Sequence, residues 1–292
     1  MTPVVLLHLF LGTYAGGNTD SFYKRFTSPR QSNLILGNSR SAQGILPHYM
    51  KSFNGEPFYN YSFTIFDSPF GDSYLSSVKN KLNPETKNGA FIVTVDPWSI
   101  SVKKEKPENF EERNAMIGKT RFTNLNPNYE YLLKNYNKSW FNLYLTRESK
   151  YKSKMFLNDN GWLEIGITFP NKEEYEKNVQ EKIKAYRDYT KEFMISEKRI
   201  DYLNQTISLL KNHGKVILIR MPQSEKIHEI ENAYSPTFNQ KMQEISRNQK
   251  IKFIDFTPLG SQFYYLDGNH LQKDSGKEFT KILNDSLQIY MK

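Results

Sequence analysis

A serine near the start of the chain and a histidine near its end are placed where nucleophilic catalysis could use them. Ser39 follows the apolar run 34–36 and Gly37, so its hydroxyl is expected at the tip of a buried strand. Asp267 and His270 lie three residues apart, a spacing that puts both on one turn. These residue types can act as nucleophile, orienting group and base in acyl transfer, because imidazole takes the serine proton while the carboxylate holds its tautomer.

Each part also has an ordinary structural interpretation. Ser39 could be the N-cap of a helix that begins near Ser41, since serine is a preferred residue at that position. The run Asp267-Gly268-Asn269 is typical of a turn. A turn gives no reason for His270, however, which follows the last predicted strand by a loop and has an aspartate three residues earlier. The combination therefore favours the catalytic interpretation.

Composition narrows the classes of function. The 292 residues include no cysteine, which excludes thiol catalysis, thiolate metal sites and disulfides. The five histidines are scattered without ligand spacing, so neither a metal nor another cofactor is expected. The formal charge of +9 could suit nucleic acid, but the lysines are spread among Asn and Glu without an arginine-rich block. We expect a solvated surface and no nucleic-acid partner.

The elements that must position this site follow an α/β pattern. Short apolar runs predict strands at residues 33–36, 57–61, 90–95, 215–220 and 251–256. Continuous apolar runs such as 216–219 are typical of parallel strands that are covered on both faces. Helical spacing over 200–210 stops at Gly214, and a last helix is expected from about Asp274. The sequence predicts a flavodoxin-like three-layer α/β/α sandwich with a central parallel sheet of about five strands.

Two stretches fall outside this alternation. Residues 101–195 are predicted to form an inserted α-rich cap within a domain that spans 27–292, with a hairpin turn at 158–162. Residues 1–26 begin with the apolar MTPVVLLHLFLGTYAG, which is shorter than the roughly 20 residues that span a bilayer. This segment could be the remnant of a membrane anchor, a signal-like remnant or an apolar segment packed on the domain. The first interpretation would make an extracytoplasmic or membrane-associated location expected.

The blocks Gly37-Asn38-Ser39 and Asp267-Gly268-Asn269-His270 resemble those of the SGNH/GDSL hydrolase superfamily. Its first block is a Gly-Asp-Ser-like strand end, and its last is Asp-x-x-His before a C-terminal helix. The resemblance implies that Ser39 is the nucleophile, His270 the base and Asp267 its orienting partner. The D-alanyl transfer proteins of cell-wall teichoic acid have the same block order.

The middle blocks of this superfamily are not matched. Gly71, or a backbone amide near Ser62, is the candidate for the second block's oxyanion donor. Asp96 stands where the third block would have asparagine, and an ionised carboxylate cannot donate a hydrogen bond. Arg40 could bind an acidic group of a substrate, although an ion pair with Asp96 is the favoured interpretation. Aromatic residues, among them Trp98 and Tyr264, could line a binding wall.

We therefore expect a serine-dependent esterase or acyltransferase. Its substrate would be a small molecule or a polysaccharide of the cell envelope that carries an O-acyl group. The alternative is a non-catalytic binding protein on the same scaffold, because the third block is absent.

Overall fold

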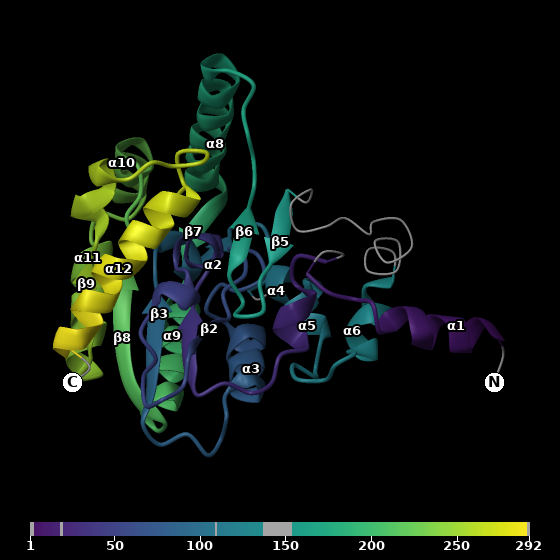
Figure 1. Ribbon diagram of the computed structural model, residues 1–292. Coiled ribbons are helices and arrows are strands. Elements are labelled where there is room, and N and C mark those ends of the chain that lie inside the picture. The colour runs from purple at the N-terminus through teal and green to yellow at the C-terminus, as the bar shows by residue number, and fades with distance from the viewer. Residues whose placement is uncertain (1–2, 18–19, 109, 137–153, 291–292) are drawn as a thin grey trace.

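The computed structural model describes residues 3–17, 20–108, 110–136 and 154–290. Its centre is a five-stranded parallel sheet with the strand order β2-β1-β3-β8-β9. This is the flavodoxin-like order, in which successive strands are added on one side of β1 and then on the other, so that a crevice forms at the carboxyl ends of β1 and β3. Helices cover both faces of the sheet, with α12 on one side and α9 on the other (Figure 1). The predicted three-layer sandwich is confirmed.

The strands of this sheet are β1 (Asn33–Leu36), β2 (Phe58–Asn60), β3 (Gly89–Thr94), β8 (Gly214–Arg220) and β9 (Lys252–Asp255). The helices that flank it include α2 (Ser39–Gly44), α3 (Asp72–Lys81), α9 (Glu197–Lys211), α10 (Glu225–Tyr234), α11 (Phe238–Asn248) and α12 (Lys273–Tyr290). Short 3-10 turns η1 (Tyr23–Phe26), η2 (Pro47–Tyr49), η3 (Pro97–Ile100) and η4 (Thr257–Gln262) complete the domain. Each predicted strand is present, to within one residue at either end.

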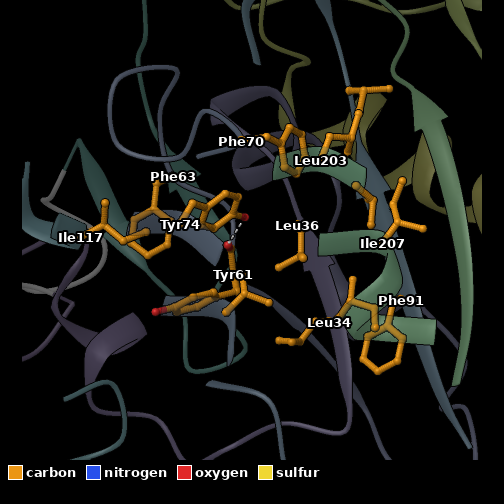
Figure 2. Close-up of a cluster of buried hydrophobic side chains, with 14 of the residues drawn as sticks. Leu34, Leu36, Tyr61, Phe63, Phe70, Tyr74, Phe91, Ile117, Leu203 and Ile207 are labelled. Carbon is orange, nitrogen blue, oxygen red and sulfur yellow. Dashed lines mark hydrogen bonds between the residues drawn. The ribbon is translucent and has the colours of Figure 1, made fainter. Parts of the chain in front are cut away.

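Successive residues of each strand point to opposite faces, which divides the apolar core into two clusters. Leu34, Leu36 and Phe91 pack with α3, α9 and α11, whereas Ile35 and Ile92 pack with α12. Figure 2 shows the first cluster, in which strand side chains meet those of α9 and of the aromatic segment after β2. Burial on both faces explains why the strand sequences are continuously apolar.

The segment between β3 and α9 contains the elements predicted as an inserted cap. They are β4 (Ser101–Lys103), α4 (Phe110–Asn114), α5 (Met116–Lys119), α6 (Tyr129–Lys134), β5 (Met155–Leu157), β6 (Leu163–Ile165), α8 (Lys172–Glu192) and β7 (Phe193–Ile195). The predicted hairpin is formed by the antiparallel pair β5 and β6. Residues 137–153 of the predicted cap lie outside the described residues. Helix α8 stands out from the body beside α10 (Figure 1).

The apolar start of the chain forms α1 (Pro3–Gly12), which extends away from the sheet (Figure 1). Most of its large side chains are exposed, with Val4 at 61% and Phe10 at 59%, whereas Leu11 packs against the first core cluster. Within the described ranges, the helices are all too short or too polar to cross a bilayer.

Candidate active site

The carboxyl end of β1 is shaped by Gly37. Its φ of +149° lies in a region that favours glycine, and a Cβ here would collide with the side chains of Thr94 and Ser41. Its backbone N–H donates to the Tyr74 hydroxyl at 3.0 Å, and its carbonyl accepts from Ser68 Oγ at 2.7 Å. Glycine therefore lets β1 approach β3 closely and turn into α2.

Helix α2 begins at Ser39, and its cap is Asn38. The Asn38 side chain accepts a hydrogen bond from the Arg40 backbone N–H at 3.1 Å. The N-cap is therefore Asn38 and not Ser39, for which the sequence had also allowed that role. Because Ser39 is in the first turn, its own N–H has no carbonyl partner within the helix. Its side chain is only partly buried, unlike those of Asn38 and Arg40.

The structure brings Ser39, His270 and Asp267 together from opposite ends of the chain. Ser39 Oγ lies 2.9 Å from His270 Nε2. On the other side of the ring, His270 Nδ1 lies 2.9 Å from Asp267 Oδ2 and 3.1 Å from Oδ1. If Nδ1 carries the proton, Nε2 is the acceptor that faces the serine hydroxyl. The distances meet the geometric requirement for a base and a nucleophile.

Local hydrogen bonds fix the shape of the loop that carries His270. Asp267 Oδ1 accepts the backbone N–H groups of Asn269 at 3.1 Å and of His270 at 2.9 Å. Gly268 has a φ of +80°, so the turn requires a residue that tolerates this conformation. The ordinary turn predicted for this sequence is therefore present, and it is also the element that orients the imidazole.

Asp267 is ionised in this setting. Burial alone would raise its pKa, but His270, with which it is also hydrogen-bonded, and the ammonium group of Lys182 outweigh burial. Together they hold the pKa of the Asp267 carboxyl well below its usual range. Lys182 Nζ lies 3.0 Å from Asp267 Oδ2. An ionised Asp267 can stabilise a positive charge that forms on the imidazole.

A buried network of charges lies beneath the serine and the histidine. Arg40 is 4% exposed; its Nε donates to Asn269 Oδ1 at 2.8 Å, and its Nη1 lies 3.3 Å from Asp96 Oδ2. Asp96 also accepts from Asn38 Nδ2 at 2.6 Å. Arg40 thus joins Asn38, which precedes the serine, to Asn269, which precedes the histidine. The structure contains the favoured Arg40–Asp96 ion pair, and both side chains are engaged within the protein.

Glu231 of α10 is the second acid of this network. Its carboxylate accepts from Arg40 Nη2 at 2.6 Å, from Arg220 Nη2 at 2.9 Å and from Trp98 Nε1 at 2.7 Å. Burial alone would lower the pKa of the Arg40 guanidinium, but Glu231 and Asp96 raise it above its usual range. Burial is also the main cause that raises the pKa of Asp96. Two arginines and two acids therefore share one buried cluster.

The candidate oxyanion donor Gly71 lies at the start of α3, where a Cβ would collide with the carboxylate of Glu112. Its surroundings are therefore those of a tight contact between α3 and α4. The N–H of Ser62, near which the other candidate was placed, donates to the Asn60 side chain at 3.2 Å. The two aromatic residues predicted to line a binding wall differ in exposure. Trp98 is buried and donates a hydrogen bond to Glu231, whereas Tyr264 is 75% exposed.

The sequence analysis did not predict three residues near the site. These are Lys182, which contacts Asp267, Glu231, which contacts Arg40, and Asn269, which contacts His270. Asn269 Nδ2 lies 3.2 Å from His270 Nε2, the same nitrogen that faces Ser39. Asn269 could have been found from its place inside the Asp-x-x-His block. Lys182 and Glu231 lie on helices with ordinary charge patterns, so nothing in their local sequence distinguished them.

No family model matches the chain, and no curated protein matches it by sequence. Among solved structures, it is similar to a Streptococcus pneumoniae protein assigned as a platelet activating factor, with 12% identity, a TM-score of 0.46 and coverage of 99% of this chain and 98% of that one. An M. smegmatis aryl esterase has 9% identity and a TM-score of 0.38, over 89% of this chain and 99% of its own.

A third similar structure is Est24, a carbohydrate acetylesterase from Sinorhizobium meliloti. It has 10% identity and a TM-score of 0.37, over 89% of this chain and 99% of its own. Sequence identity is low in all three cases.

Proposed function

We propose that the protein is a serine-dependent esterase or O-acyltransferase of the SGNH type. The observation that carries the proposal is the line of contacts from Ser39 Oγ to His270 Nε2, 2.9 Å, and from His270 Nδ1 to Asp267 Oδ2, 2.9 Å. Ser39 is only partly buried at the carboxyl edge of the sheet, where open α/β sheets bind their ligands. A buried structural serine would not need a base aligned in this way.

The reaction would proceed in two acyl transfers. Ser39 Oγ attacks the ester carbonyl while its proton passes to His270 Nε2, and a tetrahedral intermediate forms. The bond from the carbonyl carbon to the leaving oxygen then breaks, and Nε2 returns the proton to the leaving alcohol. Water or a hydroxyl group of an acceptor attacks the acyl-serine in the same manner, and the proton ends on Ser39 Oγ. Asp267 remains ionised and stabilises the imidazolium of each step.

The developing oxyanion needs hydrogen-bond donors. The backbone N–H of Ser39 is our candidate, because it lies in the first turn of α2 and has no helical partner. Asp96 is held by Asn38, Arg40 and the Ser99 backbone N–H, so it serves the scaffold in this proposal and does not face the substrate. A site with few donors would favour an activated ester over an amide.

Covalent labelling tests the proposal. A fluorophosphonate probe should label the folded wild-type protein on Ser39, and Ser39→Ala should not be labelled. His270→Ala should lose hydrolysis of 4-nitrophenyl acetate while its circular dichroism stays that of the wild type. Equal labelling of Ser39→Ala would contradict the proposal. Mass spectrometry of products formed with and without a sugar acceptor then separates hydrolysis from transfer, because only transfer produces an acylated sugar.

A non-catalytic binding protein is the second candidate, and one contact favours it. The Asn269 side-chain amide lies 3.2 Å from His270 Nε2, so it competes with the Ser39 hydroxyl for the single lone pair of that nitrogen. Under this alternative the folded protein would not react with the probe, yet it would bind an ester-bearing glycan. The same labelling experiment therefore separates the two candidates.

A further inference from the structure

We propose that Lys182 of helix α8 is a positioning residue for the catalytic carboxylate, so that the segment between β3 and α9 contributes to the site. This inference rests on the function proposed above. Lys182 Nζ lies 3.0 Å from Asp267 Oδ2, the oxygen that also contacts His270 Nδ1. Its side chain is 32% exposed, whereas that of Asp267 is 12% exposed. The ion pair therefore lies at the rim of the site, with the carboxylate on its inner side.

Lys182 is one of several hydrogen-bond partners of the Asp267 carboxylate. A carboxylate offers about four lone-pair directions. At Asp267, Oδ1 accepts two backbone N–H groups, from Asn269 and His270, and also lies 3.1 Å from His270 Nδ1. Oδ2 lies closer to that nitrogen, at 2.9 Å, and 3.0 Å from Lys182 Nζ. Lys182 is thus the second partner of Oδ2 beside the imidazole. In this proposal its contact holds Oδ2 next to Nδ1 and helps to keep the carboxylate ionised.

The same face of α8 contacts residues 265–270, the catalytic loop of this proposal, at three successive turns. Tyr175 donates from its hydroxyl to the Tyr265 carbonyl at 3.0 Å, and Val179 packs against Gly268, where an added Cβ would lie 3.2 Å from it. Lys182 follows at helical spacing. Because the tyrosine and the valine fix the helix on the loop, the lysine reaches the carboxylate from a rigid base.

The next turn of α8 reaches the buried charge network. The ring of Tyr186 lies 5.7 Å from the guanidinium of Arg40. Arg40 in turn holds Asn269, the neighbour of the catalytic histidine. Helix α8 therefore contacts both the Asp267–His270 loop and the buried charge network, and Lys182 is its contact with the carboxylate itself.

Ordinary surface ion pairs contribute little to stability, typically about 0–1 kcal/mol. A positioning role therefore needs a kinetic readout. We expect Lys182→Met to lower kcat for 4-nitrophenyl acetate on the order of 10-fold with little change in KM, by analogy with metal sites, where loss of a group that orients a ligand typically costs roughly 10- to 100-fold. Lys182→Arg, which keeps the charge and the donor, should restore most of the rate. Lys184→Met, on an exposed position of the same helix, should behave as the wild type.

A double-mutant cycle with Asp267→Asn makes the test specific. If Lys182 acts through Asp267, Lys182→Met should have almost no further effect on kcat once the carboxylate is absent. Equal losses in both backgrounds, or a Lys182→Met rate within twofold of the wild type, would overturn the inference. If Lys182→Met does not fold by circular dichroism, Lys182→Gln takes its place with the same expectations. Failure of the proposed function would look different, because the wild type itself would then neither hydrolyse the ester nor react with the probe, and both proposals would fall.

Discussion

Replacing Glu231 by glutamine should show how strongly the buried charges hold this site together. The Glu231 side chain is completely buried, and its carboxylate contacts Arg40 Nη2 at 2.6 Å and Arg220 Nη2 at 2.9 Å. With Asp96, it balances the charge of the two arginines. Glutamine has almost the same shape but no charge, so the variant leaves one positive charge uncompensated inside the protein.

Loss of one partner from a buried ion pair destabilises a protein by about 3–5 kcal/mol, because the remaining ion cannot return to water. We expect this loss for Glu231→Gln at pH 7. Burial alone would raise the pKa of Glu231, but Arg40 and Arg220 outweigh it and lower the pKa. The stabilisation is therefore present above the unfolded value of about 4.3 and is lost as the pH falls through the lower folded value. Wild type and variant should accordingly converge in acid.

Urea unfolding, followed by tryptophan fluorescence, measures this difference. The matched control is Glu229→Gln on the same helix, since Glu229 is 55% exposed and pairs with the exposed Lys226. That control should change the free energy of unfolding by less than about 1 kcal/mol. A loss of less than about 1 kcal/mol for Glu231→Gln as well would refute the reasoning, because it would mean that the buried arginines do not need this carboxylate.

Three further predictions concern the loop that carries Asp267 and His270, the end of β1 and a buried lysine. Asp267→Asn should lower kcat by roughly 10³- to 10⁴-fold without unfolding, because an amide no longer fixes the His270 tautomer. The kinetics of ester hydrolysis measure this change in kcat, and a loss below tenfold would contradict the assigned role. Gly37→Ala should destabilise the protein by about 1–3 kcal/mol, because of its φ and the collision with Thr94, and an unchanged melting temperature would argue against this. Burial lowers the pKa of Lys81 to about 7, so the folded state binds fewer protons than the unfolded state and the free energy of unfolding should rise from about pH 7 to about pH 10. Titration of Lys81→Met should lack this rise, and equal slopes for the two proteins would contradict the prediction.

Much of the fold could be predicted from the sequence, because parallel strands that are covered on both faces leave a clear apolar pattern. The runs at 90–95 and 215–220 became the paired central strands β3 and β8, which confirms that interpretation. The hairpin turn at Gly161 was equally readable, since its φ of +81° requires the residue type that the sequence shows there. Turns of this kind can be predicted from the sequence because their backbone conformation depends mainly on neighbouring residues.

The sequence predicted the three central residues of the candidate site but not the charged residues that surround them. Ser39, Asp267 and His270 lie in short motifs, and the structure places them in contact. Lys182 and Glu231 lie on helices that are far from the site residues in the sequence. Only tertiary packing brings the charge of Lys182 to Asp267 and that of Glu231 to Arg40. Long-range ion pairs leave no periodic signal in a single sequence.

The central claim is that His270, oriented by Asp267, activates Ser39 toward an acyl group. The most direct measurement is the rate at which a fluorophosphonate labels Ser39 in the wild type, in His270→Ala and in Ser39→Ala, each shown to be folded. The account predicts rapid labelling of the wild type, labelling that is at least roughly 100-fold slower without the histidine, and none without the serine. Labelling of His270→Ala at the wild-type rate would contradict it.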